Sequence, residues 1–531
     1  MNFSKLKFAW WIVPISSLII VAFFQIGSSF LEIDFDIWQH LIKYVLPLAV
    51  WNTIGTLFLA CVGVIVIGVS SAWLVSNYQF WGRSFFSWAM IMPMAIPPYI
   101  MAIVYIDAFD YSGFLQNFLR NFLQTGHSFW HIRSWWGLTL VLSLSFYPYI
   151  YLFCRSAFLT QGQELTNVAR SLGVSRWRLF LKLTLPMSKP WILAGLYLMA
   201  VETLSDFGTF SVFGIDNLTT TIYKAWFGLF NHQLALQISS LLLFIILIFW
   251  QLSKLIGRRR HFTNKDPRHS FYPLTRHQSW LAIGWLSLIF GISFLFPVVR
   301  LIIWVWQDFS TSFNWRYLDF AYNSLTISLI TASITVFLGL ILTLARHYRG
   351  SLLTRWWIQV SILGYATPSV VLAVALYVPF IKFDFWLSNL FGETKILGGT
   401  LLALVFILCQ RFLSPAYQNT TSMIKRISAN QGLSATTFGA SKIRILIKIY
   451  LPALRNGLLT GFLLVFMDVM KELPITLITR PFGWDTLAVR VFEMTSSDMF
   501  ERAAFPSLCI VLISSLVIIV INKSIESNQY G

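Results

Sequence analysis

Long, continuous apolar segments recur along the whole chain and leave few ways for it to fold. One of them, 241–250, reads LLLFIILIFW without a charged residue. Of the 531 residues, 57% are hydrophobic and 11% are charged, whereas soluble proteins carry about a quarter charged residues. Only helices and closed barrels cross a bilayer, and barrel strands alternate over about ten residues. The sequence therefore predicts an all-α polytopic membrane protein.

About twelve segments are long enough to cross a bilayer, which takes about twenty apolar residues in a helix. Six fall in the first half of the chain, near 9–29, 46–76, 84–108, 136–158, 187–210 and 234–255. Six more fall in the second half, near 279–304, 322–346, 354–382, 398–418, 453–478 and 502–522. We expect about twelve transmembrane helices, the first of them an uncleaved signal anchor.

The two halves repeat one another at a nearly constant separation. The pairs Asn52 and Asn323, Gly68 and Gly339, and Pro97 and Pro368 are each 271 residues apart, and Glu202 and Glu472 are 270 apart. The segments 213–218 and 482–487 share Phe, Gly, Asp and Leu at a separation of 269. The repeat predicts two parallel six-helix units of the same orientation. We assign them to 1–255 and 279–531, joined by a basic linker at 256–278.

Basic residues gather in the loops between the apolar segments, chiefly in 170–182, 258–260 and 425–448. The net charge of +18 therefore does not indicate nucleic-acid binding. Positive charge beside membrane spans marks the cytoplasmic side and attracts anionic lipid. We expect the linker and both termini to be cytoplasmic. The four cysteines lie in or beside apolar segments, and we interpret them as small core residues.

Two basic loops match each other closely. The first, 164–186, contains Ala169, Gly173, Leu185 and Pro186, and the second, 430–452, contains Ala435, Gly439, Leu451 and Pro452 at the same spacing. A small residue four positions before a glycine shares a helix face with it, and the glycine permits a sharp turn. Proline is tolerated in the first turn of the helix that follows. We expect each loop to contain a short helix that projects from the membrane domain.

These loops resemble the EAA motif of ABC-transporter permeases, although the acidic position of that motif holds Asn167 and Leu433, with Glu164 one turn earlier. The resemblance implies a type I importer permease whose loops act as coupling helices on two copies of a cytoplasmic ATPase. The chain contains no Gly-Lys pair, so it lacks the loop that binds ATP phosphates. We expect a transport subunit that is not an enzyme and binds no cofactor, while ATP is used by its partners. Because both halves are fused, one chain should suffice for each transporter.

Three further segments, 201–209, 470–477 and 480–487, resemble permeases of bacterial ferric-iron importers. That resemblance covers nearly the whole chain. It implies uptake of Fe(III), delivered by a periplasmic binding protein, across the inner membrane. Thiamine, phosphonate and oxyanion importers share the loop motif and remain alternatives for the cargo. A secondary transporter that needs no ATPase is a less favoured alternative, because it would not explain two coupling loops.

Four carboxylates near the ends of spans are candidates for the substrate path: Glu202, Asp206, Asp468 and Glu472. Acids inside a membrane usually face a cavity or a partner, and carboxylate oxygens suit a hard cation. The sequence assigns no metal ligands among them. An alternative for Glu472 is that it pairs with Lys471 or with the backbone and only fixes packing.

Two local patterns predict irregular helices. Pro97, Pro98 and Pro368 interrupt apolar segments and should either kink a helix or break it beside a pathway. Leu115, Phe118, Leu119, Phe122 and Leu123 follow a helical period. They predict a short amphipathic helix in the outer membrane interface.

Overall fold

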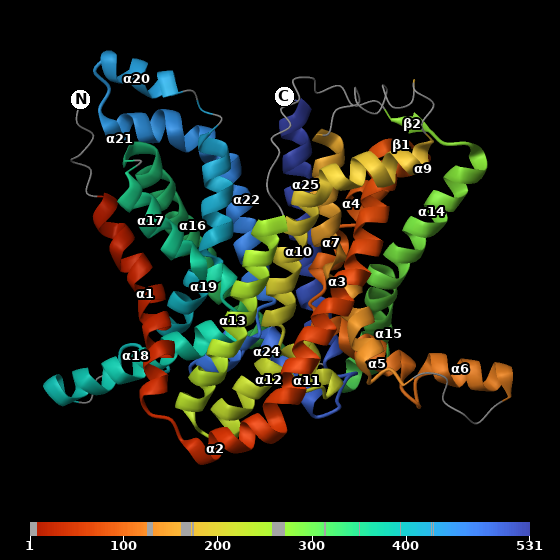
Figure 1. Cartoon of the computed structure of the whole chain (residues 1–531), viewed down its shortest axis with the longest axis horizontal. Coiled ribbons are helices and arrows are strands. Elements are labelled where there is room, and N and C mark those ends of the chain that lie inside the picture. The colour runs from red at the N-terminus through yellow and green to blue at the C-terminus, as the bar shows by residue number, and fades with distance from the viewer. Residues whose placement is uncertain are drawn as a thin grey trace.

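The computed structural model describes residues 8–124, 131–160, 171, 175–256, 271–312, 315–349, 351–392, 395–425, 427 and 429–530. Nearly all of these residues are helical, and the long helices form one bundle (Figure 1). In the labels, η marks a 3₁₀ or π turn. Membrane-embedded backbone must satisfy its own hydrogen bonds, which is why apolar segments of this length form helices.

The first half begins with α1 (Phe8–Ser28), η2 (Ser29–Leu31), α2 (Phe35–His40), η3 (Leu41–Val45), α3 (Leu46–Asn77), β1 (Tyr78–Gln79), α4 (Arg83–Ala89), η4 (Met92–Ala95), α5 (Pro98–Phe109) and α6 (Phe114–Leu123). It continues with α7 (Trp135–Thr160), α9 (Arg176–Leu179), η5 (Phe180–Thr184), α10 (Leu185–Ser205), α11 (Gly208–Phe213), α12 (Leu218–Tyr223), η6 (Lys224–Gly228) and α13 (His232–Ile256).

The second half begins with β2 (Tyr272–Pro273), α14 (Arg276–Phe290), η7 (Gly291–Leu295), α15 (Phe296–Ser312), α16 (Arg316–Arg349), α17 (Leu352–Ser361), η8 (Ile362–Ala366), α18 (Ser369–Phe391) and α19 (Leu401–Ile424). It ends with α20 (Ala429–Thr437), α21 (Lys442–Ile445), η9 (Leu446–Tyr450), α22 (Leu451–Met470), α23 (Pro474–Thr479), α24 (Leu487–Ser496) and α25 (Ala504–Tyr530).

The predicted polytopic membrane architecture is confirmed. Within the described ranges, ten helical segments are long and apolar enough to cross a membrane, and α4–η4 with α5–α6 adds an eleventh, broken span. The predicted span at 187–210 corresponds to α10, a helix that contains the charged residues Lys189 and Glu202. It packs beside α7 in the first half, just as α22 packs beside α19 in the second half. Thus every predicted span has a helical counterpart.

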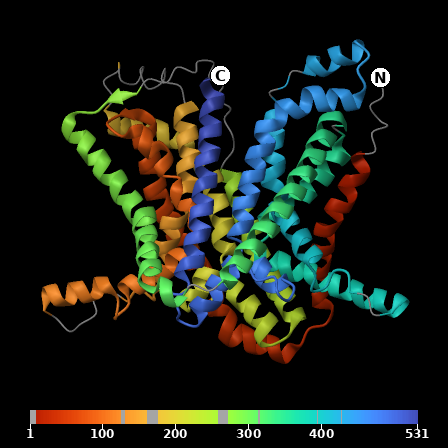
Figure 2. The same ribbon diagram turned by 180° about the vertical axis from the view of Figure 1, so that it is seen from behind.

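The prolines at matched positions break their helices. Pro97 and Pro368 each stand just before a helix with the same extended backbone, φ −55° and ψ 141° or 142°. At the first break the chain bends by 90°. The predicted spans at 84–108 and 354–382 are accordingly divided at these prolines, the first into α4, η4 and α5 and the second into α17, η8 and α18. Helices α6 and α18 project sideways from opposite edges of the bundle (Figures 1 and 2), and α6 is the predicted amphipathic helix.

The two halves interlock through their first helices. Helix α1 packs against α16, α17 and α18 of the second half, while α14 and α15 reach α3 and α5 of the first. The Arg300 guanidinium contacts Asp107 across this boundary, with 2.8 Å between Nη2 and Oδ2. The Tyr105 hydroxyl donates to the Ile292 carbonyl at 2.7 Å. The repeats therefore share one core.

The bundle has two distinct ends (Figure 1). One end, here called the loop face, carries α9, α20, α21, the start of α1 and the end of α25. There β1 pairs in parallel with β2, with Tyr78 opposite Tyr272, so the end of the predicted linker is fixed to the first half. The other end, called the far face, carries α2, α6, α12 and α18. The predicted linker residues 257–270 lie outside the described ranges.

Candidate functional site

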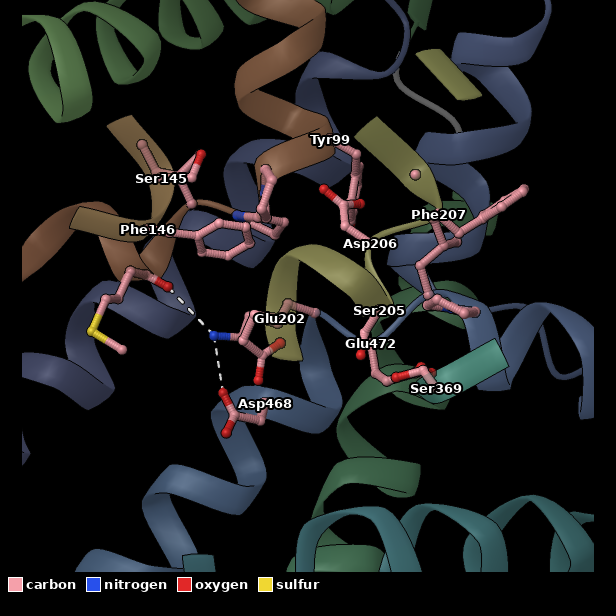
Figure 3. Close-up of a pocket in the computed structure, with 18 of the residues that line it drawn as sticks. Tyr99, Ser145, Phe146, Glu202, Ser205, Asp206, Phe207, Ser369, Asp468 and Glu472 are labelled. Atoms are coloured by element: carbon pink, nitrogen blue, oxygen red, sulfur yellow. Dashed lines mark hydrogen bonds and ion pairs between the residues drawn. The ribbon is translucent and has the colours of Figure 1, made fainter. Parts of the chain in front are cut away.

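A cavity of about 110 Å³ lies between the two halves, and Figure 3 shows residues from both in its wall. Its first-half lining is Met94, Ile96, Pro97, Pro98, Tyr99, Ser145, Phe146, Tyr149, Glu202, Ser205, Asp206, Phe207 and Gly208. Its second-half lining is Ser369, Arg411, Phe412, Asp468, Lys471, Glu472, Leu473 and Pro474. Both proline breaks supply lining residues, because a broken helix exposes backbone that an intact one would cover.

The four carboxylates singled out in the sequence all line this cavity. Glu202 and Asp206 lie at the end of α10 and just after it, and Asp468 and Glu472 take the corresponding place around the end of α22. Glu202 and Asp468 extend into the same part of the cavity from different halves, while Asp206 lies beside Tyr99 (Figure 3). Their role in substrate passage stays a prediction.

Glu472 is fully engaged with the backbone. Its Oε1 accepts from the Ile475 amide at 2.9 Å, and its Oε2 accepts from the Thr476 amide at 3.1 Å and the Thr476 hydroxyl at 3.0 Å. A carboxylate that bonds the free amides at a helix start stabilises that helix, here α23. This geometry agrees with the structural alternative for Glu472, with the backbone rather than Lys471 as its partner.

We expect Glu472→Ala to lower the stability of the folded protein by about 1–3 kcal/mol, because buried amides of α23 lose their acceptor. Thermal unfolding in detergent measures this loss. Glu501→Ala, at an exposed position, is the control and should change the stability little. A Glu472→Ala protein of normal stability that no longer transports would instead place Glu472 in the cargo path.

Arg411 is a site residue that sequence reasoning missed. It lies in α19, its side chain is 2% exposed, and Nη1 donates to the carbonyls of Tyr365 and Thr367 at 2.6 and 2.5 Å. Its Nη2 lies 3.3 Å from the Ser205 hydroxyl and 4.0 Å from Glu202 Oε1. The available signal was an arginine inside the apolar segment 398–418, since charged residues within spans usually face the protein interior.

Lys471 is the second cation of the cavity. Its Nζ lies 2.9 Å from Asp468 Oδ1 and donates to the Met94 carbonyl at 3.5 Å. Met94 and Tyr365 are 271 residues apart, so each cation contacts a carbonyl at the matched helix break. Arg411 and Lys471 thus tie the two broken helices to the walls of the cavity.

Two buried oxygens in the wall are left without protein partners. Asp206 Oδ1 accepts from the Thr209 amide at 3.0 Å and thereby caps α11. Asp206 Oδ2 and the Tyr99 hydroxyl have no hydrogen-bond partner within the described ranges. In the lining as a whole, four acidic side chains stand against two basic ones. The same ranges contain no cluster of three His, Cys, Asp or Glu side chains able to hold a resident metal ion.

An aromatic cluster, here called the cover, packs on the cavity beside α12, which lies on the far face (Figure 1). The ring of Phe207, which lines the cavity, lies 4.4 Å from the ring of Tyr223 and 5.2 Å from that of Phe492, centroid to centroid. Phe492 belongs to α24 and Tyr223 to α12. The cover therefore consists of short helices from both halves.

Matched asparagines hold the loops that precede these covering helices. The Asn52 side-chain amide donates to the Asp216 carbonyl at 2.6 Å, and that of Asn323 donates to the Gly483 and Asp485 carbonyls at 3.2 and 3.1 Å. Their conservation between the repeats thus has a structural basis.

The two predicted coupling loops are described to different extents. Ala169 and Gly173 lie outside the described residues. Leu185–Pro186 and Leu451–Pro452 begin α10 and α22, each after a five-residue π turn, η5 or η9. Ala435 is in α20, and Gly439 follows that helix with φ +76°.

The tip of the second loop is apolar and open. Phe438 is 90% exposed beside Gly439, and Ile443 and Ile447 are also exposed on the same segment. Below them, Ile445, Tyr450 and Leu454 pack into a small core with α16 and α19. An exposed apolar tip on a packed base is typical of a surface that binds another protein.

The comparison with known families decides the class of this chain. The model of the "Binding-protein-dependent transport system inner membrane component" matches residues 64–262 and 335–526. The chain belongs to this family. It is a multi-pass permease of an inner-membrane family and a transport subunit of the ABC importer class. Permeases of this family generally work with an ATPase and a substrate-binding protein. The family model matches twice, which agrees with the duplicated fold.

Several curated relatives are similar to this permease. The Fe(3+)-transport system permease protein FbpB 2 of Haemophilus influenzae is 26% identical over 479 residues, covering 89% of each chain. The molybdenum transport system permease protein ModB of the same organism is 29% identical over 164 residues, 30% of this chain and 70% of the relative. The sulfate transport system permease protein CysW of Escherichia coli is 29% identical over 164 residues, which make up 31% of this chain and 55% of the relative.

Proposed function

We propose that this permease imports ferric iron, which a periplasmic binding protein delivers at the far face. The observation that carries the proposal is the acidic cavity between the halves, with Glu202, Asp206 and Asp468 in its wall. The similarity to a ferric-iron permease over 89% of both chains supports the same cargo. Carboxylate oxygens suit a hard cation such as Fe(III), and an inside-negative potential favours its entry by about 2.3 kcal/mol per charge per 100 mV.

The proposed partners follow from the loop face. Two copies of a cytoplasmic ATPase would bind the loops 164–186 and 430–452, so the loop face and both termini would be cytoplasmic. The exposed tip around Phe438 and the basic charge of both loops support this orientation. ATP binding would close the ATPase pair and move the two loops together. The halves would then rock about the cavity and open it alternately to each side.

An oxyanion is the second candidate cargo. Arg411 and Lys471 place two cations in the same cavity, and relatives named for molybdenum and sulfate transport match about 30% of the chain. In an oxyanion route these cations would bind the cargo, as basic residues do in anion pathways. The excess of acids over bases in the lining favours the cation.

Uptake by cells with and without the chain tests the cargo. Radiolabelled Fe(III), molybdate, sulfate, thiamine and a phosphonate are supplied in parallel, and a hydrolysis-deficient ATPase partner serves as the control. We expect only Fe(III) uptake to require both the chain and a working ATPase. Uptake of molybdate or sulfate with the same requirements, and none of Fe(III), would contradict iron and select the oxyanion.

A further inference from the structure

The matched Phe-Gly segments of the two repeats differ in one exposed side chain. In the first half, Phe213 is the last residue of α11 and is 3% exposed. In the second half, the corresponding Phe482 is fully exposed on the loop between α23 and α24. The protein itself therefore leaves the ring of Phe482 uncovered, and burying an apolar side chain of this size against a partner is favourable.

A proline causes this difference. Pro481 stands where the first half has Val212, and the residue before a proline is disfavoured in the α conformation. Helix α23 accordingly ends at Thr479, and Arg480 is extended, with φ −61° and ψ 139°. Phe482 therefore leaves the helix before its ring can be buried as that of Phe213 is.

The exposed ring is held on a rigid turn. The Trp484 amide donates to the Pro481 carbonyl at 3.2 Å, and Gly483 takes φ +81°, as a tight turn requires. The side chain of Asn323 bonds the carbonyls of Gly483 and Asp485. Arg480 contacts Asp485 at 3.1 Å and Glu493 at 2.8 Å. A side chain on a preorganised turn loses little entropy on binding.

The turn is also joined to the cover of the cavity. It leads through Thr486, the cap of α24, into the helix that carries Phe492, and Phe492 packs on the cavity residue Phe207. Glu493 of α24 is the residue that Arg480 holds. Movement of the turn would therefore be transmitted to the cover.

We propose that the Phe482 turn is a docking anchor for the substrate-binding protein, whose surface would offer an apolar pocket for the ring. The inference rests on the orientation given under Proposed function, because cargo must then arrive at the end of the bundle opposite the coupling loops. The binding protein is the partner that must meet this cover to release cargo into the cavity. Only the second half carries the anchor, so the protein docks in one orientation on a nearly symmetric permease.

The test uses the complete transporter with its ATPase, reconstituted in nanodiscs. The probe is the soluble binding protein, loaded with its own cargo, that stimulates ATP hydrolysis by the wild-type complex. We expect Phe482→Ala to raise the concentration for half-maximal stimulation at least about tenfold, as loss of an interface anchor does. The maximal and basal rates should stay within about twofold, and Phe482→Tyr should resemble the wild type.

Phe35→Ala is the matched control, because Phe35 is an exposed phenylalanine at the start of α2 on the far face. It should leave the half-maximal concentration unchanged. An unchanged value for Phe482→Ala, or an equal rise for Phe35→Ala, would overturn the docking assignment while leaving the proposed function intact. A wild-type complex that no binding protein stimulates would contradict both.

Discussion

Gly439→Val is expected to reduce ATP-driven uptake at least about tenfold while the protein still inserts and folds. Gly439 has φ +76° at the end of α20, a conformation that costs a side chain roughly 1–2 kcal/mol and a β-branched one more. Its amide donates to the Thr436 carbonyl at 3.0 Å, and the Ala440 amide donates to the Ala435 carbonyl at 3.0 Å. Valine would break this turn and displace the apolar tip that we assign to the ATPase.

Gly439→Asn is the informative control for this prediction. A Cβ at this position meets no atom within 4 Å, and asparagine tolerates positive φ better than other side chains. The Gly439→Asn variant should therefore retain most of the wild-type uptake. Uptake and ATP hydrolysis are measured together in proteoliposomes, and Gly439→Val should uncouple the two. Normal coupled uptake by Gly439→Val would contradict the assignment of the 430–452 loop.

Arg411→Met is expected to lower stability by about 3–5 kcal/mol, the usual cost of breaking a buried ionic contact by removing one partner. The carbonyls of Tyr365 and Thr367 would lose their donor, and Glu202 would lose its nearest cation. Thermal unfolding of the purified protein should show a lower Tm. Adding Glu202→Gln should recover part of the loss, because the unpaired charge is then removed.

Arg355→Met provides the comparison at an exposed arginine of α17, where such changes usually stay within about 0.5 kcal/mol. If Arg411→Met and Arg355→Met unfold at the same temperature as the wild type, then Arg411 does not hold the helix break at Pro368. In that case the arginine would be free to serve as a ligand for an anionic cargo.

The predictable part of the fold came from membrane thickness and from the repeat. A bilayer requires about twenty apolar residues for each span, so each predicted span recurs as a helix or a broken pair. Pro97 and Pro368, which are 271 residues apart, break their helices with nearly the same backbone angles. Hydropathy does not specify neighbours, however, so it could not show that α1 packs against the second half. The sequence allowed either a kink or a break at Pro368, and the structure shows the break that divides 354–382 into α17, η8 and α18.

The candidate site was predicted in its acids but not in its bases. The four carboxylates meet because two of them lie near the end of α10 and two near the end of α22, the matching helices of the two halves. Arg411 lies on a different helix, and only the packing of α19 against η8 brings it to the cavity. Whether Glu472 caps a helix or binds the cargo could be decided only from the structure, because a carboxylate side chain serves for either role. The exposure of Phe482 depends on Pro481, which disfavours the α conformation at the residue before it.

Transport by Asp468→Asn and Glu202→Gln tests most directly whether cargo crosses through the cavity between the halves. Uptake of Fe(III) and ATP hydrolysis stimulated by the binding protein are measured on the same proteoliposomes, with Asp498→Asn, at an exposed acid, as the control. We predict that each cavity variant lowers uptake about tenfold or more, since contacts to a charged group contribute about 1.5–3 kcal/mol, while stimulated hydrolysis persists. Wild-type uptake by both cavity variants would contradict the assignment of this cavity as the route.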